Sequence, residues 1–204
     1  MDLDNEFVGK LSFDELQYSV RAIAPLVKDE DVDFMNTILS KRNPDTTALK
    51  RFLFNFWVTQ DPNQPEVLYG QYMEVAKAVD KMFDGGFGYG FESDRGFIYM
   101  KYGRPDDLVA VNNEPSAPPY EIWVYNDFPK TKQTNVKFLF YEPDLGTDFQ
   151  LLHSNARGEI NNPQWEVTLY SGNAPNEIQG SNYIDATQMQ DNINRRARQF
   201  FNDF

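Results

Sequence analysis

Residues 85–107 read GGFGYGFESDRGFIYMKYGRPDD. This stretch separates two parts of the chain that differ in the spacing of their apolar residues. Glycine costs about 1 kcal/mol per helical position relative to alanine, so a preceding helix is not expected to continue through Gly85–Gly90. We expect these glycines to permit positive φ and a tight crossing from a helix into a strand. The apolar and aromatic run Gly96–Tyr102 reads as that strand, and residues 102–106 read as the turn that ends it.

Upstream of this stretch the sequence predicts helices. Ser12 and Glu15 have the spacing of a capping box, and Pro25 should interrupt the helix that begins there. A second helix is expected over residues 33–41. Two apolar stripes follow at helical spacing, one in a helix from about Asp45 (Leu49, Phe52, Leu53, Phe56, Trp57) and one in a helix from about Pro65 (Leu68, Tyr72, Val75, Val79, Met82). We interpret both stripes as core that packs on a sheet.

Downstream, short apolar runs predict strands at residues 120–126, 136–141 and 149–154, the first with clear alternation between two faces. Residues 142–148 suit a hairpin connection, and the proline-rich segment 112–119 suits a surface loop. Asn162-Pro163 either caps a short helix or leads into another strand. A capping-box spacing at Asp185 and Gln188, followed by an apolar stripe to Phe204, predicts a C-terminal helix.

Helices first and neighbouring strands later favour an α+β fold. We expect N-terminal helices packed on a mainly antiparallel sheet of about four to five strands, followed by the C-terminal helix. The length of 204 residues fits one large domain or a domain with a small helical appendage. We therefore divide the chain into a helical segment, 1–44, and an α+β domain, 45–204, which together form one compact unit.

The charge balance argues against several classes of partner. Acidic side chains number 31 and basic side chains 19, which gives a net charge of −12. Such a surface repels phosphate backbones, so we expect no nucleic-acid partner and little attraction to an anionic membrane. No run approaches the roughly 18 apolar residues of a membrane span, so direct membrane insertion is not expected. The acidic start, MDLDNE, is unlike a signal peptide and leaves a cytosolic protein and a trimmed exported chain both open.

The residue types argue against most catalytic machinery. The chain has no cysteine, which excludes disulfides, thiolate nucleophiles and cysteine zinc sites. The single histidine, His153, lies in a strand-like aromatic run and reads as a hydrogen-bonded structural residue, and no serine lies in a G-x-S-x-G elbow. The glycine run lacks the phosphate-binding patterns, so we expect no cofactor.

Carboxylates keep two further hypotheses open. Glu92 with Asp94, and Asp106 with Asp107, flank the expected strand and could supply the acid and nucleophile of a hydrolase. The segment from Asp144 to Asp148 offers oxygen ligands for calcium, although such a segment is more often an acidic hairpin connection without a metal.

Candidate binding residues lie in and beyond the glycine stretch. The aromatic share is 15%, and Tyr89, Phe91, Tyr120 and Trp123 are candidates for contact with a sugar or peptide because they lie in or near expected loops. If these rings are buried, they are core instead. Asp94 and Arg95 are the charged residues of the stretch that could also meet a ligand.

Residues 91–106, FESDRGFIYMKYGRPD, resemble the signature of the GWxTD-domain family, a Gly-Trp-x-Thr-Asp-Arg-Gly run that leads into a strand and then Tyr-Gly-x-Pro-Asp. Here Phe91 stands in place of Trp and Ser93 in place of Thr, which keeps an aromatic ring and a hydroxyl. Arg51, Phe56-Trp57, Asp61-Pro62 and residues 120–125 are also similar to the family's layout. The positions that read as structural are Gly90, Gly96, Tyr102, Gly103, Pro105 and Asp106.

The resemblance implies an exported, often lipid-anchored protein of Bacteroidetes-like bacteria, in the periplasm or associated with the outer membrane. It brings no catalytic residue set. We therefore expect a non-catalytic cell-envelope module that binds another envelope protein or supports assembly. The alternative is a glycan- or peptide-binding module that uses the aromatic loop near Tyr89, and a carboxylate-dependent hydrolase is the least favoured of the three.

Overall fold

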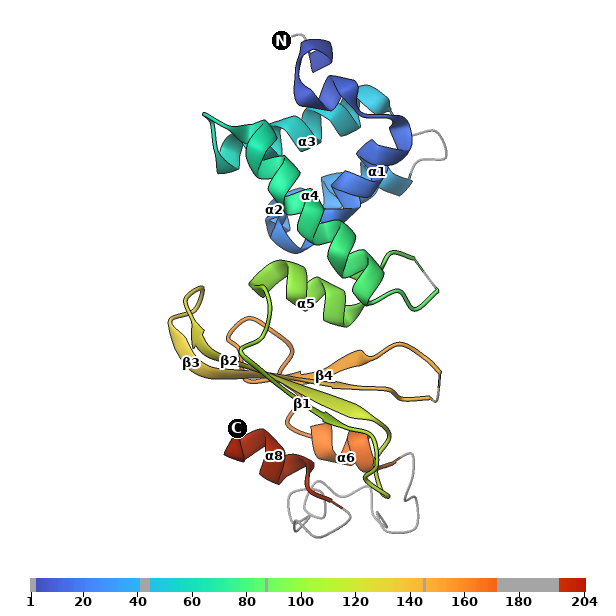
Figure 1. The fold of residues 1–204 in the computed structure, drawn as a ribbon, viewed down its shortest axis with the longest axis vertical. Helices are drawn as coiled ribbons and strands as arrows, with labels where there is room; N and C mark the ends of the chain where they lie inside the picture. The colour runs from blue at the N-terminus through green and yellow to red at the C-terminus, as the bar shows by residue number, and fades with distance from the viewer. Residues whose placement is uncertain (1–2, 41–44, 87, 145, 172–194) are drawn as a thin grey trace. The chain divides into compact units, whose positions relative to one another are not determined.

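The computed structural model describes residues 3–40, 45–86, 88–144, 146–171 and 195–204 (Figure 1). These residues form α-helices and a four-stranded antiparallel sheet, which confirms the α+β class.

The chain divides into two compact units. The first unit is residues 1–92 with 96–101, and the second is residues 93–95 with 102–204. The boundary that the sequence suggested at residues 44–45 falls inside the first unit, because helices on both sides of it share one hydrophobic core.

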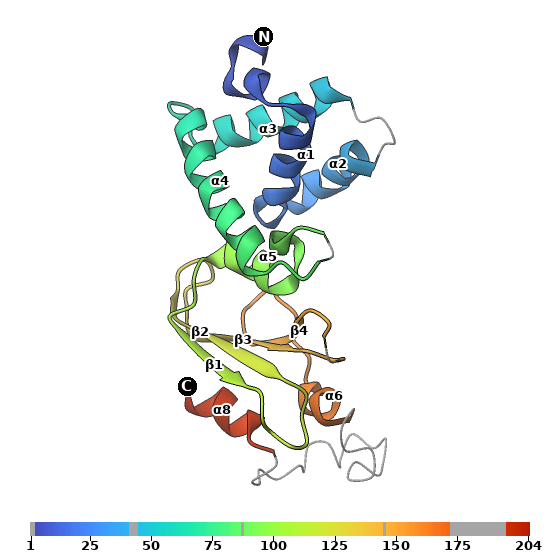
Figure 2. The ribbon, with the colours of Figure 1, turned by 45° about the vertical axis from the view of Figure 1, so that its right-hand side comes forward.

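The first unit is helical throughout the residues that the structure describes (Figures 1 and 2). Its main helices are α1 (Phe13–Ala22), α2 (Asp29–Ser40), α3 (Thr46–Gln60) and α4 (Pro65–Met82), with short 3₁₀ turns η1 (Leu3–Asn5), η2 (Phe7–Lys10), η3 (Ala24–Leu26) and η4 (Gly90–Glu92).

The predicted capping box and interruption are confirmed. At the start of α1 the Ser12 amide donates to the Glu15 carboxylate over 2.8 Å, and the Glu15 amide donates to the Ser12 hydroxyl over 3.3 Å. Pro25 lies in η3, directly after α1. At the start of α3 the Asp45 carboxylate accepts from the Thr47 amide over 2.9 Å.

The core of these helices is formed among helices. Leu49, Leu53 and Trp57 of α3 are buried in one cluster with Leu16 of α1 and Ile38 of α2. Leu49, Leu53 and Trp57 of the predicted stripe are therefore core, although their partners in this cluster are helical side chains rather than strands. The other two members, Phe52 and Phe56, are only partly buried.

The stripe predicted for α4 is partly wrong. Val75 and Met82 are exposed, whereas Met73, Ala76 and Val79 are buried. These three side chains lie in a second cluster beside α1 and η4. The buried face of α4 is therefore set by these packing partners, and it differs from the face that apolar spacing alone predicted.

Residues 94–102 are a helix, α5 (Asp94–Tyr102), and not the predicted strand. The segment contains three aromatic residues and Ile98, which raise its strand propensity, but tertiary packing overrides such a preference. Phe97 and Lys101 lie one turn apart, with the ammonium nitrogen 5.8 Å from the ring centroid. The glycine stretch therefore connects a helix to a helix.

The second unit contains the antiparallel sheet, in the order β1-β2-β3-β4. Its strands are β1 (Asp107–Val111), β2 (Tyr120–Phe128), β3 (Gln133–Tyr141) and β4 (Gln150–Ser154). The sequence located the last three strands and the hairpin connection between β3 and β4. It missed β1, a short edge strand that begins with an aspartate and buries only its last residue.

Two short helices cover one face of the sheet. These helices, α6 (Trp165–Ser171) and α8 (Ala197–Asp203), lie on the same side in both ribbon views. The first shows that Asn162-Pro163 leads into a helix, and the second confirms a C-terminal helix. The capping box predicted at Asp185 and Gln188 lies outside the described residues.

The predicted alternation along β2 is confirmed. Tyr120, Ile122 and Val124 are buried in one cluster with Leu169 of α6 and Ala197 of α8. The intervening side chains point to the opposite face, where Trp123 packs on Phe140 with ring centroids 4.9 Å apart.

The loop 112–119 was predicted to lie at the surface, yet it carries a buried carboxylate. Glu114 is 5% exposed and accepts hydrogen bonds from the Tyr120 hydroxyl (2.6 Å), the Tyr170 hydroxyl (2.8 Å) and the Arg196 amide (2.8 Å). Burial, together with these bonds, raises the pKa of both tyrosines. One carboxylate thus joins the loop to β2, α6 and the start of α8.

Replacing this carboxylate should loosen the second unit. Glu114→Ala leaves two buried hydroxyls and one amide without their acceptor, and we expect a loss of about 3 kcal/mol in the free energy of unfolding. Tyr120→Phe removes one of the three bonds and should cost about 1–2 kcal/mol. Urea denaturation measures both losses, and hydrogen exchange should show faster exchange of the α8 amides in Glu114→Ala. Equal, small losses in the two variants would contradict this role.

Candidate functional site

The glycine stretch is held in place by one aspartate of α4. The Gly90 amide donates to one carboxylate oxygen of Asp80 over 2.6 Å, and the Tyr18 hydroxyl of α1 donates to the other over 3.0 Å. Burial and the bond to Asp80 raise the pKa of Tyr18, so this phenol stays protonated as a donor. The carboxylate therefore ties α1, α4 and η4 together.

Two glycines allow the backbone to cross at close range. A Cβ atom on Gly96 would meet the carbonyl oxygen of Gly90 and lie 2.7 Å from the Cα atom of Phe91. A Cβ atom on Gly90 would meet the carbonyl oxygen of Asp80 and lie 2.9 Å from the carbonyl carbon of Phe83. Real Cβ atoms do not occupy such positions, so both residues must be glycine for the chain to pass. Gly90 and Gly96 thus have a steric role in this crossing.

Three rings pack beside this crossing. Tyr18 meets Tyr89 edge-on at 4.9 Å and Phe91 edge-on at 5.1 Å, and Tyr89 stacks on Phe91 at 5.2 Å. Phe91 is buried, whereas Tyr89 is 37% exposed and lines a surface hollow of about 310 Å³ together with Tyr18 and Lys77. Tyr89 is therefore accessible to a ligand at this place.

The other aromatic candidates are buried and do not form a recognition surface. Phe91, Tyr120 and Trp123 are all at most 2% exposed, and the last two lie within β2 rather than in a loop. The indole nitrogen of Trp123 donates to Glu121 over 3.0 Å. Of the four rings that the sequence singled out, Tyr89 alone presents a substantial surface.

Asp94 and Arg95 bind strands of the second unit. The Asp94 carboxylate accepts from the Leu151 amide of β4 over 2.6 Å. The Arg95 guanidinium contacts Glu121 of β2 and Asp148, each at 3.1 Å, and lies 4.3 Å from the Phe149 ring centroid. These contacts assign the two side chains to holding the sheet edge and the β3–β4 connection.

The remaining motif positions also serve the backbone. Tyr102 donates to Glu159, and the Tyr125 hydroxyl donates to the carbonyl of Gly103 over 2.9 Å. Gly103 has a φ of +84°, the left-handed conformation expected of a helix end, and Pro105 follows it in the turn to β1.

The carboxylates of the hydrolase hypothesis are each bound by a different group. Glu92 pairs with Arg21 at 3.0 Å, whereas Asp94 caps β4 and Asp106 accepts from the Asn126 amide over 2.7 Å. Asp107 is an exposed residue at the start of β1. Within the ranges that the structure describes, no three acidic or histidine side chains gather as a metal site would require.

His153 has the structural surroundings that the sequence predicted. Its Nδ1 atom accepts from the Asn162 amide over 3.1 Å, and its ring stacks on Trp165 at 6.0 Å and tilts against Phe201 at 5.2 Å. Burial lowers the pKa of this imidazole, so it is neutral at pH 7.

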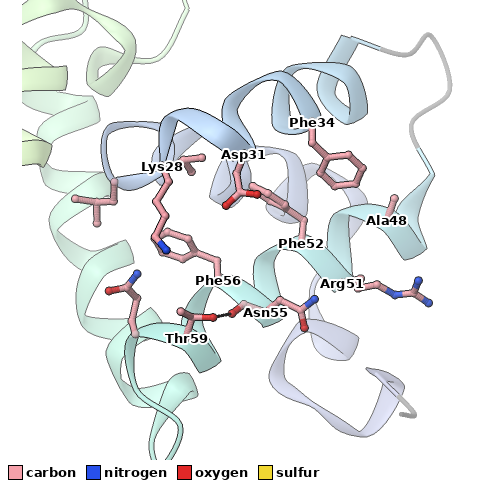
Figure 3. A pocket seen from close by; sticks show the side chains of 12 residues that line it. Lys28, Asp31, Phe34, Ala48, Arg51, Phe52, Asn55, Phe56 and Thr59 are labelled. Carbon is pink, nitrogen blue, oxygen red and sulfur yellow. Dashed lines mark hydrogen bonds between the residues drawn. The ribbon is translucent and has the colours of Figure 1, made fainter.

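An aromatic groove lies between α2 and α3, and sequence reasoning missed it. It has a volume of about 490 Å³, and Figure 3 shows Phe52 and Phe56 of α3 facing Phe34, Asp31 and Lys28 from the α2 side. The remaining lining residues are Leu26, Val27, Ala48, Arg51, Asn55, Thr59 and Gln60. Volumes of 300–1,000 Å³ are typical of ligand pockets.

Phe34 is the most exposed ring of this α2–α3 groove. It is 52% exposed and packs on Phe52 with centroids 5.8 Å apart. A signal existed in the sequence, because residues 48, 52 and 56 follow one another at intervals of four on α3. The prediction assigned Phe52 and Phe56 to the core, and the facing residue of α2 could not be paired with them without the structure.

Comparison with protein families gives a match to the GWxTD domain over residues 15–166. The matched segment begins in α1 and ends in α6, so it contains the α2–α3 groove, the glycine crossing and the whole sheet. Comparison with curated proteins and with solved structures gives no match. Among the residues described, no helix is long and apolar enough to cross a membrane.

The same substitution at two helical glycines should have opposite effects. Gly96→Ala forces its new methyl into the backbone of Gly90 and Phe91, and we expect a loss of about 3 kcal/mol in the free energy of unfolding. Gly70→Ala lies in exposed α4 with open space around it, and should stabilise by about 1 kcal/mol. Thermal or urea denaturation measures both. A Gly96→Ala protein as stable as the unmodified chain would refute the close crossing.

His153 should make stability fall on mild acidification. Its pKa is lowered by burial in the folded chain, so below about pH 6.5 the unfolded chain binds the proton first and gains stability relative to the folded one. We expect the urea midpoint to fall more between pH 7.5 and pH 5.5 in the unmodified protein than in His153→Asn, which keeps an acceptor for the Asn162 amide. Parallel pH profiles would contradict the assignment.

Proposed function

The chain belongs to the GWxTD-domain family, and from this membership and the α2–α3 groove we propose that it is a non-catalytic module that binds another protein of the cell envelope. The observation that carries the proposal is the groove itself, with a half-exposed Phe34 packed on Phe52, and Phe56 as a further ring of its lining. Aromatic side chains are enriched where proteins bind one another, because they bury a large area with few rotatable bonds.

The chemistry of the motif supports a non-catalytic role. Asp94 and Asp106 accept bonds from strand amides, and Glu92 is ion-paired with Arg21. The bonds of Asp94 and Asp106 fix the backbone, and the hollow that Glu92 lines has no second carboxylate among its described lining residues. The motif of this chain therefore serves the fold, which leaves recognition to surfaces such as the α2–α3 groove.

The place of action is proposed from the family resemblance. The signature of this chain resembles that of exported proteins of Bacteroidetes-type bacteria. We therefore propose that the chain works in the periplasm or beside the outer membrane. Its partner there would be another envelope protein. The net charge of −12 is in keeping with a partner other than nucleic acid.

A second candidate function rests on Tyr89. This ring is partly exposed beside a hollow of about 310 Å³ that also presents Lys77, Glu15 and Asp14. An exposed ring among polar groups is the surface on which a sugar or a short peptide can lie. The hollow supports this alternative less strongly, because among its lining residues only one ring, that of Tyr89, is exposed.

Phe34→Ser should abolish partner binding without unfolding the chain. We expect a photoreactive amino acid in place of Asn55 to cross-link one envelope protein in extracts of a bacterium that carries the gene, and the Phe34→Ser change to remove that cross-link. The matched control is Phe204→Ser, since Phe204 is 53% exposed and also tilts against one neighbouring ring. Circular dichroism checks that both variants fold.

The outcome separates the two candidate functions. If Phe34→Ser and Phe204→Ser cross-link equally, the α2–α3 groove is not the binding site. If binding to the same extract is lost only in Tyr89→Ser, the hollow beside Tyr89 takes its place.

A further inference from the structure

We propose that protonation of His153 opens the C-terminal helix α8 away from the sheet, so that α8 is a pH-dependent cover over one sheet face. Three observations carry this inference. The helix has a small apolar hold on the sheet, the His153 ring packs among the side chains that bind its end, and the hydrogen bond of that ring requires its neutral form. All of these groups belong to the second unit.

The helix α8 is short and buries little apolar surface. It has seven residues, Ala197–Asp203, and only Ala197 among them is buried. A helix of this length is not stable in water by itself, so α8 depends on its contacts with the rest of the unit. Elements with few buried apolar contacts open at a lower free energy than the core. We therefore expect α8 to open while β2 and β3 stay paired.

The start of α8 is held mainly by α6. The Ala197 amide donates to the Tyr170 hydroxyl over 3.1 Å, and the Arg198 guanidinium contacts the Glu166 carboxylate at 2.7 Å. The bond from the preceding amide to Glu114, described above, adds to this hold. A displacement of α6 therefore displaces the start of α8 as well.

The end of α8 is held by side chains that pack around His153. The Lys137 ammonium of β3 donates to the backbone carbonyls of Phe201 and Asn202, and its nitrogen lies 5.6 Å from the Phe201 ring centroid. The His153 ring tilts against the same Phe201 ring at 5.2 Å. A positive charge on His153 would thus lie near the ammonium that binds the helix end, and like charges repel.

The hydrogen bond of His153 requires a neutral ring. Its Nδ1 atom accepts from the Asn162 amide over 3.1 Å. A neutral imidazole has one accepting nitrogen, whereas the protonated ring has two donors and no acceptor. Asn162 in turn organises the start of α6, since its carbonyl accepts from the Trp165 amide and its side chain accepts from the Gln164 amide. Protonation of Nδ1 therefore breaks the bond to the segment that positions α6.

The carboxylates on the elements around this ring are engaged with other groups. The charged residues of β3, α8, α6 and the loop before α6 are Lys137, Arg198, Asp203, Glu166, Arg157 and Glu159. Asp203 attracts the Lys137 ammonium. Glu166 pairs with Arg198. Glu159 accepts from the Tyr102 hydroxyl.

The sign of the pH dependence follows from the two states of the ring. In the closed state burial holds the pKa of His153 below its ordinary value of about 6.5, and in the open state the ring meets water and regains that value. Below about pH 6.5 the open state therefore binds the proton more readily. The opening equilibrium then rises as the pH falls, by up to about tenfold per pH unit.

Hydrogen exchange of the full chain tests the opening. We expect the protection factors of the α8 amides to fall about five- to tenfold between pH 7.5 and pH 5.5, and to lie below those of β3 at both values. Urea below the unfolding midpoint should accelerate exchange in β3 more than in α8, because a local opening exposes less surface. Equal protection of α8 and β3 at both pH values would mean that α8 opens only when the whole unit unfolds, which overturns the proposal.

Two variants identify the titrating group. His153→Asn keeps an acceptor for the Asn162 amide and does not titrate, so the protection of α8 should change less than about twofold between the two pH values. Lys137→Met keeps the histidine but lacks the donor to the α8 carbonyls, so protection should be lower at both pH values and should still fall on acidification. A pH-dependent α8 in His153→Asn, or a pH-independent one in Lys137→Met, refutes the role of the imidazole.

The ring can also be followed in the unmodified protein, because His153 is the single histidine of the chain. Its imidazole resonances in NMR give its pKa directly. We expect a value below about 6.5, with chemical-shift changes of the Asn162 and α8 amides over the same pH range. A pKa at or above that value would mean that cation–π attraction to Trp165 and Phe201 outweighs burial, and the proposal would then be wrong.

Discussion

At Gly96 the backbone of α5 passes so close to Gly90 and Phe91 that no side-chain carbon fits between them. The positions of neighbouring groups follow from this steric constraint. Gly90 must lie where the Asp80 carboxylate can accept from its amide, and Phe91 must then enter the cluster beside α1 and α4. Tyr18 completes the arrangement by donating to the same carboxylate. The positions of the glycines, of Asp80 and of the rings thus all follow from the close approach of α5 to Gly90 and Phe91.

This constraint separates the residues that build the fold from those that are free to recognise a partner. Asp94, Arg95 and Tyr102 have the polar character of site residues, but their bonds are made to strands and to Glu159. The α2–α3 groove lies elsewhere in the first unit, and its most exposed ring, Phe34, is not among the side chains of the core that α1, α2 and α3 share. Phe34 can therefore change without disturbing the core, whereas Gly96 cannot.

Local patterns predicted much of the fold, because capping boxes, prolines and apolar periodicity act within a few residues. The sequence located α1, α3 and strands β2 to β4 for this reason. Interactions between distant segments decided the rest. Residues 96–102 have strand-like composition but pack as a helix, and Glu114 lies in a proline-rich loop yet is buried by Tyr120 and Tyr170, the latter 56 residues away. The α2–α3 groove also needed the structure, since its two walls come from separate helices.

The order of the compact units along the chain determines where it can be divided, by truncation or by recombination of the gene. Residues 93–95 belong with the sheet, and residues 96–101 return to the helices, so the units interleave at this point. A piece that ends at Glu92 lacks Gly96 and the α5 residue Met100, which packs in the cluster with α4. A piece that begins at Gly96 lacks the Arg95 that contacts Glu121 of β2. No single cut yields two whole parts. Recombination at this junction would damage both, so the two units must be inherited as one block.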